Sequence, residues 1–273
     1  MKPTPIVILL DVDGTIVGNV EHQVAMYDII STMKKKKVKI PYVQRDMHEA
    51  LQFNGLARPS FRCFIDDLES NNIEVFIYTA AEKTWAEHIV KNLEAAFNIK
   101  INRPIFNRSH CVTINNQIMK SIQKVTPMVT KTLKSKGYDT SSLSTRMMAV
   151  DNNPVFIENH LQILCSTYSV ISPVNIPAFI PKHVFDSNTK DIINVLCSYY
   201  PSHIKPTTNY MKLQRYFYTM YIELLSENLR VKQETYHDSL FKVIKDVLLT
   251  KKVTNITPEY IQYMQRKINT KHH

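Results

Sequence analysis

The chain has 273 residues, 44% of them hydrophobic, and a formal net charge of +10. This length suits one α/β domain with an added part, and the absence of any apolar run near the roughly 20 residues of a bilayer helix predicts a soluble, globular protein with no membrane span. The charge favours an acidic partner such as nucleic acid, a phosphoprotein or an anionic surface. The four cysteines form no C-x-x-C pair, so neither a zinc site nor a disulfide framework is indicated.

The first predicted element is a buried strand at Ile6 to Leu10, directly before the segment DVDGT. Its apolar run is about half as long as a signal-peptide core and leads straight into acidic residues, which favours a strand. Val75 to Tyr78 and Met147 to Val150 are similar short runs, and each of the three runs ends in a polar cluster.

Helical spacing separates these strands. Helices are predicted around Pro59 to Ser70, from Lys83 to Phe97, and after Pro127, which is well placed as a first helical residue. Strands that alternate with helices predict a parallel sheet of βαβ units. Ligands bind such sheets beyond the carboxyl ends of the strands, which is where DVDGT, TAAE and DNNP fall.

The pattern becomes wholly helical from about Lys205. Apolar residues at three- and four-residue spacing form two stripes, one of Leu213, Phe217, Met220 and Leu224 and one of Leu240, Ile244 and Val247. A last helix is opened by Thr257, a plausible N-cap, with Pro258 next. We therefore predict a domain over residues 1–204 and a helical extension over residues 205–273, docked through these stripes rather than mobile.

The pair Asp11 and Asp13 supplies what phosphoryl transfer to a carboxylate needs, a nucleophile and a nearby proton donor. In an extended strand both side chains share a face, and Gly14 lets the chain turn sharply afterwards. The same segment could instead form a simple turn or part of a calcium loop. Its position directly after a buried strand favours the catalytic interpretation, because calcium loops usually follow a helix.

Candidate phosphate-binding residues follow along the chain. Thr79 ends the second strand, and the small side chains of Ala80 and Ala81 would let a phosphate approach the backbone amides. Lys120 could supply a fixed positive charge. Each residue also has an ordinary alternative, since threonine at a strand end is a common helix N-cap and most lysines are solvated.

The third strand ends in Asp151, Asn152 and Asn153, followed by Pro154. Carboxylate and amide oxygens are the hard ligands that magnesium prefers. An Asx turn before proline is the alternative. With the Asp pair already present, a metal site is favoured.

The ordered set of motifs resembles the haloacid-dehalogenase superfamily, and within it the phosphatases similar to NLI-interacting factor, which include small phosphatases of the RNA polymerase II C-terminal domain. The resemblance covers roughly Pro5 to Tyr200. It is carried by DVDGT and by LARPSFRCFIDDLESNNIEVFIYTAAEKTWAEHIVKNLE, PIFNRSHC, QIMKSIQKV, MMAVDNNPVFI and VFDSNTKDIINVLCSYYP. It implies a Rossmann-like parallel sheet flanked by helices.

The resemblance also implies roles for the candidate residues. Asp11 would be the phosphoryl acceptor, Asp13 the general acid and base, and Thr79 and Lys120 phosphate binders. Mg²⁺ would be held by Asp11, the backbone carbonyl of Asp13, and Asn152, with Asp151 nearby in its water shell. The implied substrate is a phosphoprotein such as the C-terminal domain of RNA polymerase II, in an intracellular setting, nucleus or cytoplasm.

Two features depart from the family pattern. Gly14 stands where those phosphatases usually have glutamate, and the stretch from Asn19 to Gly55 does not match their substrate-pocket insert. The helical extension has no counterpart in the family pattern. Because its apolar stripes are expected to be docked, truncation after Tyr200 should leave the phosphatase chemistry in principle intact but make the protein less soluble.

Three functions fit these observations. The first is a phosphatase for phosphoserine and phosphothreonine in proteins, acting through an aspartyl-phosphate. The second is a nucleotide or polynucleotide phosphatase, which the basic charge would suit. The third is a subunit of a complex that acts mainly through its helical extension.

Overall fold

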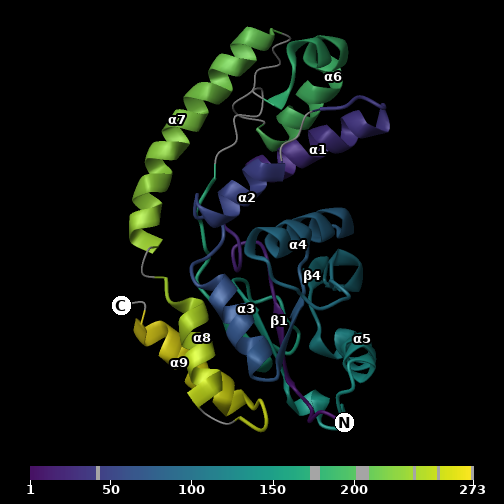
Figure 1. The fold of residues 1–273 in the computed structure, drawn as a ribbon, viewed down its shortest axis with the longest axis vertical. Coiled ribbons are helices and arrows are strands. Elements are labelled where there is room, and N and C mark those ends of the chain that lie inside the picture. The colour runs from purple at the N-terminus through teal and green to yellow at the C-terminus, as the bar shows by residue number, and fades with distance from the viewer. Residues whose placement is uncertain (41–43, 173–178, 201–208, 236–237, 251–252, 272–273) are drawn as a thin grey trace. The chain divides into compact units, whose positions relative to one another are not determined.

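Figure 1 shows a computed structural model of the chain, which describes residues 1–40, 44–172, 179–200, 209–235, 238–250 and 253–271. The chain divides into two compact units, each assembled from separate stretches of sequence. Unit 1 comprises residues 1–18, 57–169 and 236–273, and unit 2 comprises residues 19–56 and 170–235.

Unit 1 is built on a parallel four-stranded sheet with the order β2-β1-β5-β6. Its strands are β1 (Ile6–Leu10), β2 (Ile73–Ile77), β5 (Met147–Asp151) and β6 (Gln162–Leu164). In the central strand β1, Leu10 is in register with Ile77 of β2 and with Val150 of β5. Every residue of β1 is buried, as expected for a parallel strand covered on both faces. The carboxyl ends of β1, β2 and β5 therefore lie side by side.

Helices of unit 1 cover the sheet. On one face, Val7 and Leu9 of β1 belong to the same buried cluster as Val125 and Val129 of α5 (Ile122–Ser135). Successive strand residues point to opposite faces, so the side chains of Ile8 and Leu10 lie on the other face of the sheet. A two-stranded antiparallel hairpin precedes α5 and consists of β3 (Val112–Ile114) and β4 (Gln117–Met119).

Helix α3 (Phe61–Ser70) packs beside β2. Helix α4 (Lys83–Phe97) contacts α3, since the ring centres of Phe97 in α4 and Phe61 in α3 lie 5.9 Å apart. Figure 1 shows α3 and α5 on either side of β1.

The last two helices, α8 (Leu240–Thr250) and α9 (Pro258–Lys271), belong to unit 1. The ring of Phe241 stacks on Phe64 of α3 at 4.8 Å. At the sheet edge, the Gln265 side chain of α9 accepts from the backbone N–H of Leu164 at 2.9 Å and donates to its carbonyl at 2.8 Å. Covering an edge strand in this way removes a template for unwanted strand pairing.

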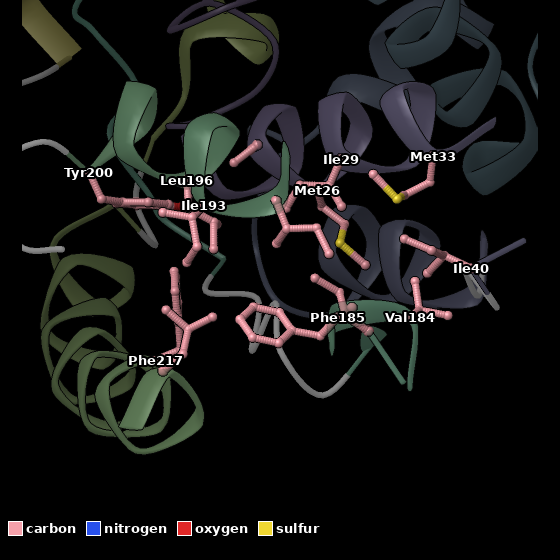
Figure 2. Close-up of a cluster of buried hydrophobic side chains, with 14 residues drawn as sticks. Met26, Ile29, Met33, Ile40, Val184, Phe185, Ile193, Leu196, Tyr200 and Phe217 are labelled. Carbon is pink, nitrogen blue, oxygen red and sulfur yellow. The ribbon is translucent and has the colours of Figure 1, made fainter. Parts of the chain in front are cut away.

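Unit 2 is helical and has a core of its own. Its helices are α1 (Glu21–Lys35), α2 (Gln44–Gln52), α6 (Lys182–Tyr199) and α7 (Tyr210–Thr235). Figure 2 shows the core, in which Met26 and Ile29 of α1 face Phe185 and Leu196 of α6, with Phe217 of α7 at one side. The apolar faces of three helices thus bury one another.

The predicted fold class is confirmed: a parallel sheet is flanked by helices, and helices follow in the C-terminal part. The three predicted strands and the helices at Pro59 to Ser70 and Lys83 to Phe97 are present. The expected start at Pro127 is wrong, because α5 begins at Ile122 and Pro127 lies inside it.

The predicted boundary between residues 204 and 205 falls on residues 201–208, which lie outside the described part of the chain, so it stays a prediction. In the described ranges, no helix has both the length and the apolar character to cross a bilayer.

Candidate active site

Two carboxylates extend the central strands of unit 1 at their carboxyl ends. Asp11 follows β1 directly, and its backbone N–H donates to the carbonyl of Val150 at 3.0 Å. Asp151 is the last residue of β5. Both side chains are buried, with 7% and 1% exposed. The predicted convergence of the first and third motifs is therefore present in the structure.

Lys120 joins these two carboxylates. Its Nζ lies 2.6 Å from Oδ1 of Asp11 and 2.7 Å from Oδ2 of Asp151, and the lysine side chain is only 2% exposed. The rings of Tyr78 and Phe156 lie 5.8 and 5.7 Å from the same ammonium. A solvated lysine, the alternative left open by the sequence, is excluded by this burial.

The backbone around Lys120 is held from both sides. Its N–H donates to the carbonyl of Val155 at 2.7 Å, and its carbonyl accepts from the N–H of Ile157 at 2.9 Å. Immediately afterwards, the carboxylate of Glu158 accepts from the backbone N–H of Ile122 at 2.9 Å, in the first turn of α5. An acidic group at a helix N-terminus satisfies free N–H groups and interacts favourably with the helix dipole.

The site has an excess of negative charge. Burial alone would lower the pKa of the Lys120 ammonium, but the carboxylates of Asp11 and Asp151 raise it above its usual value. Burial, together with the charge of Asp11, raises the pKa of Asp151 to about 6 despite its contact with Lys120. The two carboxylates therefore keep Lys120 charged, but this single ammonium does not fully compensate the negative charge around Asp151.

Asp13 has the properties of a proton donor. Burial and the negative charge of Asp11 raise the pKa of its carboxyl group to about 6, while Lys120 and a hydrogen bond from the Trp85 side chain oppose the rise. Its Oδ1 is buried and has no hydrogen-bond partner among the described residues. A carboxyl group with a pKa near neutral pH can both give and accept a proton.

The turn after β1 packs against Asn152. The Thr15 hydroxyl accepts from the backbone N–H of Asn152 at 3.1 Å and donates to its side-chain oxygen at 3.3 Å. Gly14 has a φ of +77°, and a Cβ placed there would lie only 2.7 Å from Nδ2 of Asn152. Glycine is therefore required here both by the left-handed backbone and by the close approach of the asparagine.

Thr79 follows β2 at the same edge of the sheet and is buried. Its hydroxyl accepts from the backbone N–H of Ala81 at 3.1 Å, which leaves the hydroxyl proton for another acceptor. The carbonyl of Ala80 accepts from Nε of Arg108 at 2.8 Å. Arg108 therefore fixes the loop that follows Thr79.

The donors at this edge fit a divalent cation. Within the described ranges, no three His, Cys, Asp or Glu side chains form a metal-binding group by themselves. The predicted ligand set does not depend on one, since it combines Asp11 with the backbone carbonyl of Asp13 and the amide oxygen of Asn152. Asp11, Asp13 and Asp151, when ionised, carry three negative charges against one positive charge on Lys120. The two remaining charges and the unpartnered Oδ1 of Asp13 match a hard divalent ion.

The sequence assigned no role to three residues that support the site. Glu158 holds the start of α5, Trp85 hydrogen-bonds to Asp13, and Arg58 donates to the carbonyl of Thr15 at 2.9 Å. Arg58 and Trp85 carried a signal only as parts of the segment LARPSFRCFIDDLESNNIEVFIYTAAEKTWAEHIVKNLE, which contributes to the family resemblance.

Comparison with known proteins gives no match among curated sequences. Among solved structures, the chain is similar to a variant of the fission yeast RNA polymerase II CTD phosphatase Fcp1 bound to beryllium fluoride, with 14% identity and a TM-score of 0.37 over 85% of this chain and 66% of that one. It is also similar to Fcp1 described as an essential RNA polymerase II CTD phosphatase, with 15% identity and a TM-score of 0.39 over 97% of this chain and 71% of that one.

The family model of the NLI interacting factor-like phosphatases matches residues 6–169, which is more than half of the chain. The match contains every predicted site residue. It ends before the segment VFDSNTKDIINVLCSYYP, of which residues 184–199 lie in α6 of unit 2. The chain belongs to the NLI interacting factor-like phosphatase family, of the haloacid-dehalogenase type.

Proposed function

We propose that this protein is a magnesium-dependent phosphatase that acts on phosphoserine and phosphothreonine in proteins, with Asp11 as the phosphoryl acceptor. The observation that carries the proposal is the buried ammonium of Lys120 between Asp11 and Asp151, at 2.6 and 2.7 Å. Such a charge orients a carboxylate nucleophile and can also hold a phosphate oxygen. Family membership supports the same chemistry.

In the first step, a carboxylate oxygen of Asp11 attacks phosphorus and the bond to the leaving oxygen breaks. Lys120 holds Oδ1 of Asp11, so Oδ2 is the oxygen available for attack. Asp13 gives its proton to the leaving oxygen. With a pKa of about 6, about one enzyme molecule in ten holds this proton at pH 7, far more than with the ordinary pKa of an aspartate.

In the second step, a water molecule attacks phosphorus, the Asp11–phosphorus bond breaks, and Asp13 takes the proton of the water. Thr79 and the backbone amide of Ala80, together with Lys120, hold the phosphate oxygens in both steps. Mg²⁺ would be held by Asp11, the carbonyl of Asp13 and Asn152, with Asp151 nearby, and when bound it neutralises charge on the phosphate.

The substrate proposal comes from the family and from the similar structures, whose names describe RNA polymerase II CTD phosphatases. We extend this to a phosphorylated C-terminal domain of RNA polymerase II as one candidate substrate, in the nucleus or cytoplasm. The net charge of +10 would attract a phosphorylated peptide at long range.

A single set of assays tests the proposal. Hydrolysis of phosphopeptides, nucleotides and 3′- or 5′-phosphorylated DNA is compared with Mg²⁺ and with a chelator. We expect magnesium-dependent hydrolysis with phosphopeptides as the best substrates. Preference for nucleotides or DNA would contradict the protein substrate but not the chemistry, and no hydrolysis of any substrate would favour the role of a complex subunit.

The nucleophile is tested separately. Asp11→Asn should abolish turnover and also the stable complex with beryllium fluoride and Mg²⁺, because both need a nucleophilic carboxylate. The exposed Asp186→Asn is the control and should keep both. Full activity in Asp11→Asn would rule out the assignment.

A further inference from the structure

Arg58 is a fully buried arginine beside the candidate active site. Its side chain is 0% exposed. Nη1 donates to the carbonyl of Thr15 at 2.9 Å, and Nη2 donates to the carbonyl of Ser166 at 2.6 Å. The guanidinium also lies 5.2 Å from the centre of the Tyr168 ring. It therefore ties the turn after β1 to the segment after β6.

The counter-ion of this arginine comes from far along the chain. Nε of Arg58 lies 3.0 Å from Oδ2 of Asp238, whose side chain is only 8% exposed. Oδ1 of the same aspartate accepts from the backbone N–H of Leu240 at 3.1 Å, at the start of α8. Arg58 lies inside the family match of residues 6–169, whereas Asp238 lies outside it.

A short chain of contacts leads from Asp238 to a predicted magnesium ligand. Arg58 holds the Thr15 carbonyl at 2.9 Å, and the Thr15 hydroxyl bonds both the backbone and the side chain of Asn152. A buried guanidinium without a counter-ion is strongly unfavourable. Loss of the Asp238 charge would therefore shift Arg58, and with it Thr15 and Asn152.

We propose that Asp238, which lies beyond the family region, is a positioning residue of the active site: through Arg58 it fixes the turn at Thr15 and so the orientation of Asn152. This inference rests on the proposed function for its link to magnesium. It also replaces the expectation that truncation after Tyr200 leaves the chemistry intact, because that truncation removes Asp238, the buried counter-ion of Arg58.

The test compares two aspartates that each form an ion pair with a different partner. Asp238→Asn removes the charge beside Arg58 and keeps the shape. Asp67→Asn is the matched control, because Asp67 pairs with Lys245 of α8 at 2.7 Å, on α3 and away from the turn. Both variants lose one ion pair between residues 238–250, which comprise α8 and the two residues before it, and an earlier part of unit 1.

The first readout is magnesium binding without turnover. Trp85 is the single tryptophan of the chain and hydrogen-bonds to Asp13, so its fluorescence reports on the site. We expect Asp238→Asn to raise the Mg²⁺ concentration at half-saturation by about tenfold, the size typical of residues that orient metal ligands. Asp67→Asn should stay within about twofold of the wild type, and Asp238→Glu should fall between wild type and Asp238→Asn.

The second readout needs neither metal nor activity. Hydrogen exchange of the backbone amides of Thr15, Ile16 and Asn152 should be faster in Asp238→Asn than in Asp67→Asn. Equal exchange and equal magnesium binding in the two variants would overturn the inference.

Two further outcomes can be told apart: failure of the proposed function and failure of a variant to fold. A wild-type protein that hydrolyses no phosphate ester would refute the proposed function, while the exchange readout would still decide the inference. If Asp238→Asn does not fold, Asp238→Ser is used, because it removes the charge and keeps an oxygen for the backbone N–H of Leu240. Wild-type magnesium binding and exchange in that variant would overturn the inference.

Discussion

The charge of Lys120 is shared by two carboxylates that would otherwise be buried without a cation. Asp11 and Asp151 are 7% and 1% exposed, so removal of the lysine leaves both in a medium of low polarity. Breaking a buried ion pair by deleting one partner typically costs several kcal/mol. The same residue therefore supports folding and, in the proposed mechanism, phosphate binding.

We predict that Lys120→Met lowers the free energy of unfolding by about 3–5 kcal/mol in metal-free buffer. Mg²⁺ should restore part of this loss, because a divalent cation compensates the same carboxylates. Urea unfolding with and without Mg²⁺ measures both effects. The control is Lys131→Met, an exposed lysine of α5, and equal losses in the two variants would contradict the prediction.

The glycines Gly14 and Gly137 form a natural comparison. Both have a positive φ, +77° and +82°, but a Cβ at Gly14 would meet Asn152 at 2.7 Å, whereas a Cβ at Gly137 has nothing within 4 Å. Substitution by alanine therefore strains the backbone in both cases. Only at position 14 does it also displace a predicted metal ligand.

We expect Gly14→Ala and Gly137→Ala each to lose about 1 kcal/mol of stability from the left-handed backbone. Gly14→Ala alone should also raise the Mg²⁺ requirement, by about fivefold or more, since it moves Asn152. Thermal unfolding and magnesium titration separate the two effects. An unchanged magnesium titration in Gly14→Ala would count against Asn152 as a ligand.

His22 of unit 2 makes stability depend on pH. Burial lowers its pKa to about 4, and its Nδ1 lies 2.8 Å from the hydroxyl of Tyr200. As the pH falls from about 6.5 towards 4, the unfolded chain gains a proton that the folded chain does not. The folded state therefore loses stability in this window, by up to about 3 kcal/mol in total.

We predict that His22→Gln shows a smaller loss of stability between pH 7 and pH 4.5 than the wild type does. The free energy of unfolding is measured by urea titration at both values. The exposed His160→Gln should behave as the wild type. An identical pH dependence in all three proteins would show that His22 is not responsible.

Helix α8 illustrates how an amphipathic element is held at the scale of secondary structure. Phe241 is fully buried and stacks on Phe64 at 4.8 Å, while Leu249 of the same helix is 37% exposed. Replacing a buried aromatic residue by alanine removes burial energy and leaves a cavity. The position of a residue on the helix should therefore decide its effect.

We expect Phe241→Ala to lower the free energy of unfolding by about 3–5 kcal/mol and Leu249→Ala by clearly less. Limited proteolysis should also cut Phe241→Ala faster within α8. A small effect of Phe241→Ala, with rapid cleavage of α8 in the wild type, would show that the helix is not docked.

Much of the site could be predicted from the sequence because its residues follow short apolar strands. Asp11, Thr79 and Asp151 each come after such a run, and parallel strands bring their carboxyl ends to one edge. Lys120 was identified through the family resemblance rather than through any local pattern. Its burial and its contacts with both carboxylates are visible only in the structure.

Other features depend on contacts that no local pattern encodes. Arg58 and Asp238 are 180 residues apart in sequence. The start of α5 was misplaced because Ser121 caps the helix, with its side chain accepting from the N–H of Lys124. In the C-terminal part, the spacing of apolar residues predicted which helix faces are buried, but it did not predict which unit each face packs into. In the first stripe Leu213 and Phe217 are buried in unit 2, whereas Met220 and Leu224 are only partly buried. The stripe of Leu240, Ile244 and Val247 is buried in unit 1.

At the scale of the whole molecule, each unit has a buried core of its own. The core of unit 2 contains Met26, Phe185 and Phe217, and that of unit 1 includes Val7, Phe76 and Val129. A compact unit with its own core can lose structure by itself. A substitution that destabilises one core should therefore increase local unfolding mainly in the same unit.

We predict that Phe217→Ala accelerates hydrogen exchange in α1 and α6 and leaves exchange in β1 and β5 close to the wild-type rate. Phe76→Ala, in the other core, should have the opposite distribution. Exchange followed by peptide mass spectrometry resolves the segments. Equal acceleration in both units would mean that they unfold as one cooperative body.

The ion pair between Arg58 and Asp238 also bears on the order in which the protein matures during synthesis. A ribosome makes the N-terminal part first, and domains generally begin to fold as soon as they emerge. All strands of the sheet and the residues of the candidate site precede residue 170, but Arg58 gains its counter-ion only when Asp238 has been made. A nascent chain that ends before Asp238 should contain the strands of the sheet, but its turn at Thr15 should not yet be fixed by the ion pair between Arg58 and Asp238. The activity would then appear late in translation, after unit 2 has been synthesised.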